Sequence, residues 1–258
     1  MTRTVHVIGI GAGHPEHLTL QAVAAMNRVD VFFTIDKGEA TADLAALRTE
    51  LLRRHVARPH RVVVAPEVPR DRDPADYLDT ATTWQSRREA LYERMIAAEL
   101  GDGGTGGFLV WGDPSLYDGT LTLLHRIAER SAEKIEIVAV PGISAVSALA
   151  AAHRLVLNRV GTPVLITTGR RLAERGMPAD VGDVVVMLDG RQAFADLPDT
   201  DLDAFWGAYL GTPDEILVSG DLRAVRAEIL TRRAEARARK GWIMDTYLLR
   251  RRTGPATD

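Results

Sequence analysis

The sequence has no cysteine, and this absence removes several kinds of chemistry at once. Disulfide bonds, thiolate metal sites and a cysteine nucleophile are excluded, and a chain without cysteine is compatible with a reducing cytoplasm. The seven histidines contain no H-x-x-x-H pair, so the helical spacing of two metal-binding imidazoles is missing as well. We therefore expect no metal site.

Long apolar runs and a strong charge of one sign are also missing. The longest uncharged run, Ile137 to Ala152, is too short to span a bilayer and contains Pro141-Gly142, while glycine interrupts the apolar N-terminal stretch by Gly9. The 32 basic and 35 acidic residues give a net charge of -3, which favours neither nucleic acid nor an anionic membrane. We expect a cytoplasmic protein with no nucleic-acid or membrane partner.

The pattern of apolar residues predicts an α/β fold with two domains. Of the 258 residues, 46% are hydrophobic, and strands alternate with helices as far as Trp111, which indicates a parallel sheet covered by helices. Beyond that point strand-like runs follow one another closely, in VLITT, DVVVML, WGAYL and EILVSG, and indicate a mixed sheet. We place the boundary near residues 112–117, giving an N-terminal domain of residues 1–113 and a C-terminal domain of residues 114–258.

The stretch VIGIGAGHPEHLTL, residues 7–20, predicts a strand, a glycine turn and a helix. The glycine-rich fingerprint of dinucleotide-binding proteins requires a third glycine five residues after the first, and His14 occupies that position when counting starts at Gly9. An acidic residue, Asp36, closes the next strand, as that fingerprint would require. A nicotinamide-dependent oxidoreductase therefore stays open on these residues alone.

Three later stretches also join a strand to a turn. In WGDPSLYDG, residues 111–119, Asp113 is placed either to accept hydrogen bonds from a ribose or an amino group or to cap its own turn. In VPGISAVSALA, residues 140–150, Ser144 is placed to cap the following helix or to bind a ligand. The stretch ITTGRR ends in Arg170 and Arg171.

Taken in order, these motifs resemble the tetrapyrrole (corrin and precorrin) methylase family. The resemblance rests on VIGIGAGHPEHLTL, WGDPSLY, VPGISAVSA, LITTGRR, VVVMLDG and GAYLGTPDEIL, and it covers nearly the whole chain. It implies two α/β domains with S-adenosylmethionine bound in a cleft between them, and a homodimer. The opening glycine loop would then lie along a substrate trough and would not hold a dinucleotide.

The resemblance also implies which residues bind the ligands. Substrate-binding positions in the first loop are Gly11 and Gly13, where Ala12 and His14 replace the proline and aspartate of the family's usual G-x-G-P-G-D-P. Cofactor-binding positions come from the later turns and strands: Gly112, Asp113, Leu116, Ser144, Ala145, Met187, Leu210 and Thr246.

Within the family, the segment VFFTIDKG…ADLAALR is similar to the member that methylates precorrin-5 at carbon 1 and releases the acetyl group as acetate. Acetyl loss needs a base that activates water and a donor for the developing oxyanion. We expect Asp36 and Lys37 in these catalytic roles, because they end a strand; the other available side chains are His14, Asp113, Thr167 and Thr168. Another precorrin C-methyltransferase, or a sensor that binds without turnover, remains an alternative.

A precorrin carries many carboxylates, and arginine binds carboxylates with two parallel hydrogen bonds. We expect Arg170 and Arg171 to bind the substrate in this way. Four further arginines are weaker candidates, because charged side chains in such positions are more often solvated: Arg70, Arg72, Arg87 and Arg88.

Overall fold

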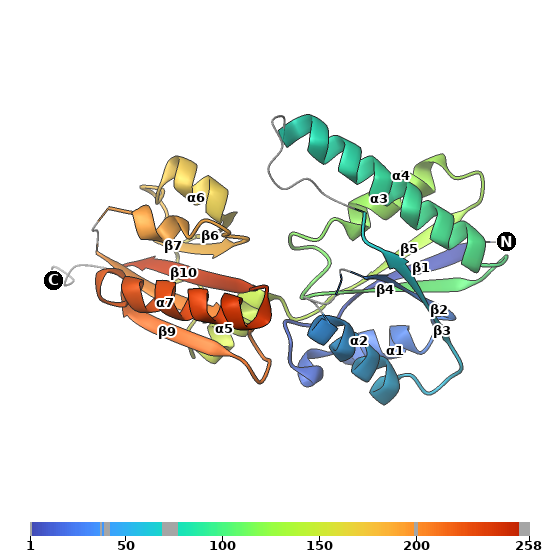
Figure 1. Ribbon diagram of the computed structural model, residues 1–258, viewed down its shortest axis with the longest axis horizontal. Helices are drawn as coiled ribbons and strands as arrows, with labels where there is room; N and C mark the ends of the chain where they lie inside the picture. The colour runs from blue at the N-terminus through green and yellow to red at the C-terminus, as the bar shows by residue number, and fades with distance from the viewer. Residues whose placement is uncertain (1, 37, 39–41, 69–76, 199–200, 253–258) are drawn as a thin grey trace. The chain divides into compact units, whose positions relative to one another are not determined.

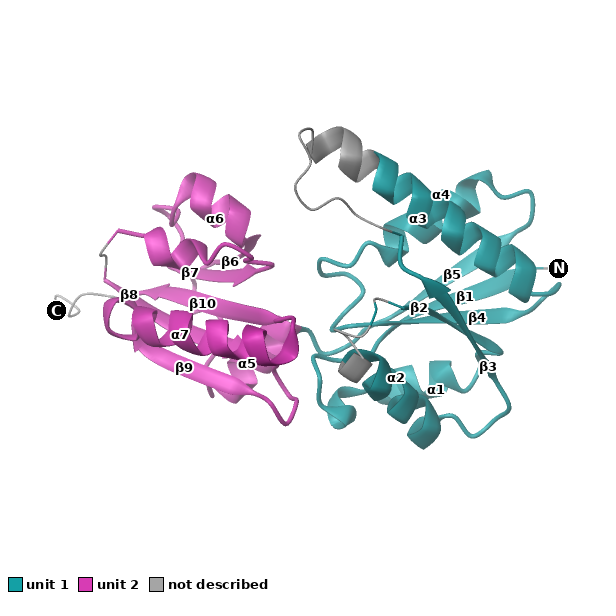
Figure 2. Ribbon diagram, viewed as in Figure 1, with its two compact units in different colours: residues 1–144 teal, residues 145–258 magenta. Residues whose placement is uncertain are grey.

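The structure is a computed structural model (Figure 1). It describes the chain except residues 1, 37, 39–41, 69–76, 199–200 and 253–258, and it also leaves aside the side chains of residues 42–43 and 77–82. The chain forms two compact units, residues 1–144 and residues 145–258 (Figure 2). The first unit is longer than the expected domain of residues 1–113, because a strand at Ile135–Val140 pairs with the first strand of the chain.

The first unit is a parallel sheet with helices on both faces (Figure 1). Its five strands have the order β3-β2-β4-β1-β5, and every neighbouring pair is parallel, which confirms the fold expected from the alternating pattern. The elements are β1 (Arg3–Gly9), η1 (Pro15–His17), α1 (Leu20–Met26), β2 (Val31–Asp36), α2 (Ala42–His55), β3 (Arg61–Pro66), α3 (Tyr77–Glu99), β4 (Thr105–Val110), α4 (Thr120–Arg130) and β5 (Ile135–Val140).

Alternation along the strands decides which helices cover each face of this sheet. Val5 and Val7 of β1 pack in one core cluster with residues of α3 and α4, whereas Ile8 and Ile10 pack in another with residues of α1 and α2. Successive side chains of a strand point to opposite faces, so a continuous apolar strand needs a helix layer on each side.

The second unit is a mixed sheet with the order β6-β7-β10-β8-β9. The β6–β7 pair is parallel and the other three pairs are antiparallel, which confirms the mixed sheet expected from closely spaced strands. The elements are α5 (Ala145–Ala152), β6 (Val164–Thr168), α6 (Gly169–Arg175), β7 (Asp183–Met187), η3 (Ala193–Asp196), β8 (Leu202–Ala208), β9 (Ile216–Asp221), α7 (Leu222–Lys240) and β10 (Asp245–Arg251).

Helix α6 was not expected from the sequence, where ITTGRR was interpreted as a strand followed by a turn. Thr168 caps this helix, since its Oγ1 accepts a hydrogen bond from the backbone N–H of Arg171 at 3.5 Å. A helix of two turns with a glycine at its first position gives almost no apolar periodicity, so its signal is weak.

One face of the second sheet carries a core with α6, η3 and α7 that includes the fully buried Trp206 and Tyr247. A buried ion pair lies at its edge, between Arg233 Nε of α7 and Asp245 Oδ2 of β10 at 2.8 Å, and both side chains are 6% exposed. The side chain of Asp245 also accepts a hydrogen bond from Trp206 Nε1. The buried charge is therefore paired, as burial requires.

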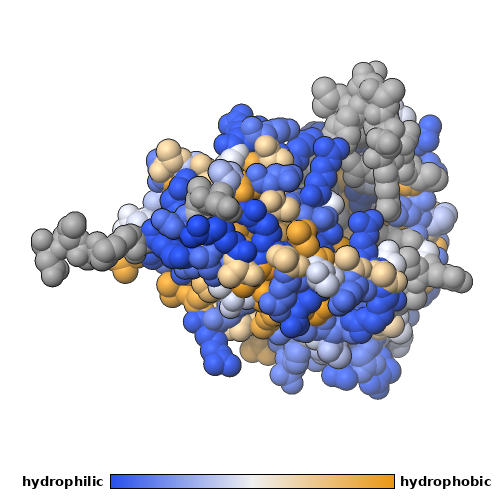
Figure 3. Space-filling model, turned by 60° about the vertical axis from the view of Figure 1, so that its left-hand side comes forward, coloured by the Kyte–Doolittle hydropathy of each residue, from blue (hydrophilic) through white to orange (hydrophobic). Residues whose placement is uncertain are grey.

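Charged and polar side chains dominate the face of the molecule drawn in Figure 3, with apolar side chains in smaller patches between them. Among the described residues, no helix is long and apolar enough to cross a membrane.

Candidate active site

The parallel strands of the first unit all end at the same edge of the sheet, and this edge gathers the turns singled out in the sequence. Gly11 follows β1, Asp36 ends β2, and Gly112 follows β4. Gly11 and Gly112 form an antiparallel bridge, in which Gly112 N–H donates to Gly11 O at 2.8 Å and Gly11 N–H donates to Gly112 O at 3.3 Å. The carboxyl edge of a parallel sheet is where ligands of α/β proteins usually bind.

Three glycines meet at this edge with their backbones in close contact. A Cβ atom on Gly142 would lie 2.2 Å from Gly112 O and 2.8 Å from the Cα of Gly9, and a Cβ on Gly9 would lie 2.7 Å from Gly112 O. These distances leave no room for any side chain, so glycine is required at these positions for packing. The ends of β1, β4 and β5 are thereby fixed against one another.

Asp113 ties two of these turns together. Its Oδ2 accepts a hydrogen bond from Gly142 N–H at 2.9 Å, and its Oδ1 accepts from Ser115 N–H at 2.8 Å and from the Ser115 hydroxyl. Partial desolvation by itself would raise the pKa of Asp113, but these hydrogen bonds from Ser115 and Gly142 outweigh it and lower the pKa. Asp113 is therefore an ionised clamp between the turns, and one of the two roles expected from the sequence, capping its own turn, is confirmed.

The first loop shows what the unusual His14 does. Its Nδ1 accepts a hydrogen bond from Glu16 N–H at 3.1 Å, so the imidazole caps the short helix η1 at the position where the family's usual loop has an aspartate. Gly11 has φ +82°, and a Cβ there would lie 2.2 Å from the Cβ of His17. Gly13 has φ 154° and is buried. The loop keeps a capped, compact conformation with His14 in place of an aspartate.

Asp36, one of the two expected catalytic residues, is exposed at the end of β2. Its Oδ1 accepts a hydrogen bond from Gly38 N–H at 2.8 Å, which fixes the turn that follows the strand. The other, Lys37, lies outside the described residues, as do Arg70 and Arg72. Asp36 thus lies at the carboxyl edge of the sheet, and its catalytic role stays a prediction.

In the second unit, the sheet aligns several expected cofactor residues in one row. Met187 of β7 pairs with Thr246 of β10, and Thr246 pairs in turn with Gly207 of β8. Leu210 packs over this row, because a Cβ on Gly207 would lie 2.7 Å from its Cδ2. The structure therefore brings together three residues that are far apart in the sequence: Met187, Leu210 and Thr246.

The hydroxyl of Thr246 cannot donate a hydrogen bond to a ligand without losing the one it already donates. It donates to Val186 O at 2.8 Å, and the residue is 2% exposed. Thr168 also belongs to the row, since it pairs with Met187, whereas Thr167 pairs with Val186 and lies on the opposite face of the sheet. The two adjacent threonines considered for the oxyanion therefore do not share a face.

The remaining expected positions divide between the two units. Leu116 is half-buried in the turn after Asp113, to whose carbonyl its N–H donates at 3.2 Å. Ser144 is the last residue of the first unit and Ala145 begins α5 in the second.

The arginines expected to bind substrate carboxylates lie in different settings. Arg170 and Arg171 are exposed in the first turn of α6, where the side chain of Arg170 lies 3.9 Å from Glu174. Arg87 is also exposed. Arg88 instead stacks on the ring of Trp84 at 4.8 Å and donates to the Tyr92 hydroxyl at 3.0 Å, so its guanidinium is held against its own helix. The carboxylate-binding role of Arg170 and Arg171 stays a prediction.

Arg48 was not singled out in the sequence as a functional residue, although it ends the quoted motif ADLAALR. Its guanidinium carbon lies 5.5 Å from the ring centroid of Trp111, next to the Gly112-Asp113 turn. A signal was present, because Arg48 precedes the buried Leu51 and Leu52 by three and four residues and so shares their face of α2.

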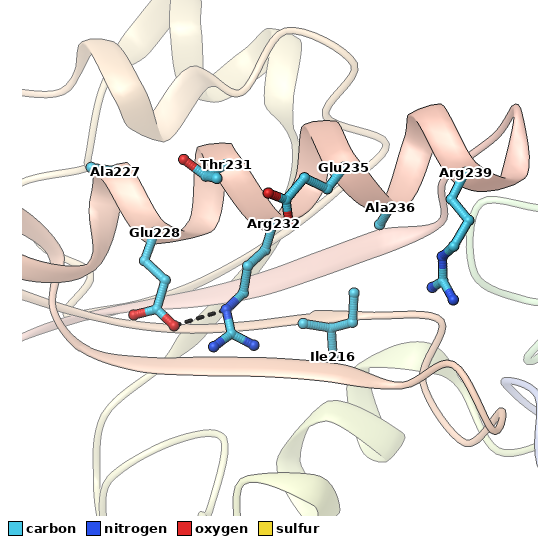
Figure 4. Close-up of a pocket in the computed structure, with 8 residues that line it drawn as sticks. All are labelled: Ile216, Ala227, Glu228, Thr231, Arg232, Glu235, Ala236 and Arg239. Atoms are coloured by element: carbon cyan, nitrogen blue, oxygen red, sulfur yellow. Dashed lines mark ion pairs between the residues drawn. The ribbon is translucent and has the colours of Figure 1, made fainter.

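The second unit also has a surface hollow of about 760 Å³ between α7 and β9, shown in Figure 4. Glu228 and Arg232 line it and form an ion pair with each other at 2.8 Å, and Arg239, also in its wall, pairs with Asp214 at 3.0 Å. None of the expected site residues that the structure describes lines it. Because three of its four charged side chains already form ion pairs, we do not assign the active site to it.

Comparison with known proteins gives the family. A sequence profile of the Tetrapyrrole (Corrin/Porphyrin) Methylases matches residues 4–226, a range that includes the glycine loop, both later turns, Met187 and Leu210, and that ends before Thr246. The chain belongs to the tetrapyrrole methylases. The opening loop is therefore the first loop of a methylase, and the dinucleotide interpretation is not supported.

Two curated methylases are similar in sequence. Precorrin-6A synthase [deacetylating] from Sinorhizobium sp is 46% identical over 250 residues, which cover 96% of this chain and 95% of that protein. Precorrin-2 C(20)-methyltransferase from Sinorhizobium sp is 30% identical over 188 residues, 71% of this chain and 72% of that protein.

Solved structures of methylases have the same fold. The crystal structure of a cobalamin synthesis related protein (CobF) from Corynebacterium diphtheriae has a TM-score of 0.81 and 35% identity, covering 97% of this chain and 99% of that one. Uroporphyrin-III-C-methyltransferase from Thermus thermophilus has a TM-score of 0.57 at 18% identity, covering 96% and 92%, and this likeness concerns the fold alone.

Proposed function

We propose that this tetrapyrrole methylase is an S-adenosylmethionine-dependent enzyme of cobalamin biosynthesis that methylates precorrin-5 at carbon 1 and releases the acetyl group as acetate. The observation that carries the proposal is the 46% identity to a deacetylating precorrin-6A synthase over 96% of the chain. The weaker match to a precorrin-2 methyltransferase covers 71% of the chain and makes another precorrin C-methyltransferase the second candidate.

The residues at hand fit an adenosyl ligand. Asp113 Oδ2 accepts one hydrogen bond, from Gly142, and a carboxylate oxygen has room for a second, such as one from a ribose hydroxyl. In the second unit, Met187 is half-buried at the end of β7 and Leu210 lies close by, so apolar side chains are available to a purine or a methionine chain.

We propose these cofactor-binding residues: Gly112, Asp113, Leu116, Ser144, Ala145, Met187, Leu210 and Thr246. Thr246 would act through its position in the sheet, because its hydroxyl is bonded to Val186. The expectation of a cleft between the units stays a prediction. We extend the proposal to a homodimer and to a cytoplasmic location, as the family resemblance implies.

Methyl transfer depends more on the positioning of the substrate than on reactive side chains. S-adenosylmethionine supplies an activated methyl group, and the protein's task is to hold the nucleophilic carbon of the substrate in line with it. The glycine contact at the ends of β1, β4 and β5 supports this task, because it fixes the three strand ends against one another. Gly11 and Gly13 would border the macrocycle there.

Deacetylation needs a base, and we propose Asp36 with Lys37 beside it. As a water oxygen bonds to the acetyl carbon, Asp36 takes a proton from that water. The bond between the acetyl carbon and the macrocycle then breaks, and its electron pair stays on the macrocycle, where it balances the positive charge brought by the transferred methyl group. Acetic acid leaves and releases its remaining proton to water as it becomes acetate. Asp36 is exposed at the ligand-facing edge, so water and substrate can reach its carboxylate.

Calorimetric titration with S-adenosylmethionine, S-adenosylhomocysteine and NAD, followed by an assay of acetate release from precorrin-5, tests the proposal. We expect binding of the two adenosyl ligands, no binding of NAD, and one acetate released per methyl transferred. Methyl transfer to a different precorrin without acetate would establish the second candidate. Binding of NAD alone would contradict both.

A further inference from the structure

Several of the arginines that are buried or half-buried in the described part of this protein are neutralised by a nearby carboxylate. Arg233 pairs with Asp245, and Arg250 pairs with Asp183, whose side chain is fully buried. Arg48 of α2 differs from them. Its side chain is half-buried, but no carboxylate of a described residue lies within ion-pair distance.

The Arg48 side chain is held in place by neutral groups. Its Nε donates to Leu109 O of β4 at 3.3 Å, and its guanidinium lies over the ring of Trp111, with its carbon 5.5 Å from the centroid. These two contacts leave the N–H groups of Nη1 and Nη2 without an acceptor among the described residues. They form the edge with which arginine binds a carboxylate through two parallel hydrogen bonds.

The surroundings of Arg48 offer donors and little negative charge. The indole Nε1–H of Trp111 is buried and also has no acceptor in the described part of the chain. Desolvation lowers the pKa of Arg48, and the Coulombic influence of Tyr92 and Asp118 opposes this effect without cancelling it. A positive charge is thus kept partly out of water with unused donors, an arrangement that an anionic ligand would complete.

The position of Arg48 connects it to the proposed substrate site. Trp111 immediately precedes Gly112 and Asp113, so the guanidinium lies at the carboxyl edge of the first sheet, where Gly11 and Asp36 also lie. We propose that Arg48 binds one side-chain carboxylate of the tetrapyrrole through Nη1 and Nη2, with Trp111 as its support. This inference rests on the proposed function, because that function supplies the carboxylate-rich substrate.

Other arginines of the same helix provide the control. Arg53 and Arg54 both pair with Glu50, and the side chain of Arg53 is 70% exposed. Arg53→Gln therefore removes one positive charge from α2 at a place that has no role in the proposal. Arg48→Gln removes both the charge and the pair of N–H donors on Nη1 and Nη2, and Arg48→Lys keeps the charge without this pair of donors.

The experiment measures three quantities on the full chain for each variant: the KM for precorrin-5 from acetate release, the Kd for uroporphyrin III from the porphyrin's absorbance, and the Kd for S-adenosylhomocysteine by calorimetry. In Arg48→Gln we expect KM and the uroporphyrin Kd to rise roughly 10- to 100-fold, as for loss of a charged hydrogen bond, with S-adenosylhomocysteine affinity unchanged. Arg48→Lys should lie in between, and Arg53→Gln should match the wild type.

Each other outcome has a distinct meaning. Unchanged KM and uroporphyrin affinity in Arg48→Gln would overturn the inference. Parallel loss of S-adenosylhomocysteine binding in both Arg48 variants would overturn it too, since Arg48 would then support the structure of the unit. If the wild type releases no acetate but binds uroporphyrin in an Arg48-dependent way, the proposed function fails and the carboxylate site stands.

Discussion

The two units of this protein fix their expected ligand-binding residues by different means. In the first unit, backbone contacts fix the turns: Gly9, Gly112 and Gly142 are in contact, and the half-buried carboxylate of Asp113 ties two turns together. In the second, side chains of a mixed sheet stand in a register row, Met187 beside Thr246. The first arrangement depends on the absence of side chains and the second on their alignment.

The cores that support the two sheets also differ. The first sheet is covered on both faces by helices with apolar contacts. The second sheet has buried charge in its core layer: Tyr247 donates to Asp189 at 2.6 Å, and Arg233 pairs with Asp245. Substitutions should therefore destabilise the first unit through steric conflict and the second through unpaired charge.

The largest effect should come from breaking the buried pair of the second unit. Arg233→Met leaves Asp245 buried without its cation, and such a loss costs about 3–5 kcal/mol. Arg232→Met is the matched control. Arg232, the neighbour of Arg233 in the chain, is half exposed and pairs with Glu228 on the surface, where an ion pair contributes less than about 1 kcal/mol. Urea unfolding of both variants gives the comparison, and equal losses would show that burial of the pair does not matter.

The glycine contact of the first unit should give the next largest effect. Gly142→Ala places a Cβ 2.2 Å from Gly112 O, and overpacking of this kind costs about 1–3 kcal/mol. We also expect loss of acetate release, because the turn that bears Ser144 must move. Gly101→Ala is the control, since no atom lies within 4 Å of its added Cβ. If the Gly142→Ala enzyme were stable and active, glycine would not be required at this position for packing against Gly112.

A smaller effect should follow Asp113→Asn, which keeps the shape of the clamp. Three donors, two N–H groups and one hydroxyl, now bond to the two oxygens of the carboxylate, and an amide has only one oxygen to accept them. We therefore expect S-adenosylhomocysteine to bind about tenfold more weakly, as for one lost charged hydrogen bond. Calorimetry measures this change. Asp102→Asn, an exposed turn residue before β4, should bind like the wild type. Equal affinity in both variants would leave the clamp without a role in binding.

The smallest expected effect is the dependence of stability on pH, to which one histidine of each unit contributes. Desolvation by burial lowers the pKa of His6 in the first unit and of His153 in the second, below the ordinary 6.5. Below about pH 6.5 the unfolded chain binds protons that the folded chain does not, so stability is fully present above that pH and falls as pH decreases.

Urea midpoints at pH 7.5 and pH 5.5 test this dependence. His6→Gln should narrow the difference between the two midpoints, and substitution of the exposed His125 by glutamine should leave it unchanged. An acid dependence equal to that of the wild type in His6→Gln would show that His6 does not contribute.

Much of the fold followed from the sequence, because strands with short apolar runs and helices with one apolar face leave strong patterns. The parallel first sheet and the mixed second sheet were both expected. The boundary was expected too early because β5, although it follows the Trp111 turn, pairs with β1 inside the first sheet. The local pattern of apolar residues does not indicate which strands pair with one another. Helix α6 was missed because seven residues are too few for helical periodicity to show.

The candidate site was foreseen unevenly. The sequence offered two roles for Asp113, and the contact with Gly142, distant in the chain, shows that it clamps two turns. Thr167 and Thr168 were both available candidates for deacetylation, and the pleat sends their side chains to opposite faces of the sheet. The sequence did not point to Arg48 because its setting depends on Leu109 of β4 and on Trp111 just after that strand, both far from Arg48 in the chain.

The sequence by itself determined the class of the protein: an α/β chain without cysteine chemistry, with ordered turn motifs that identify a tetrapyrrole methylase. Local chemistry is enough for this, since glycine turns, apolar periodicity and motif order are properties of neighbouring residues. Only the tertiary structure decided which of these residues meet: the three glycine backbones, the Met187–Thr246 row, and Arg48 over Trp111. Those contacts join segments far apart in the chain, and the packing of a whole sheet sets their distances.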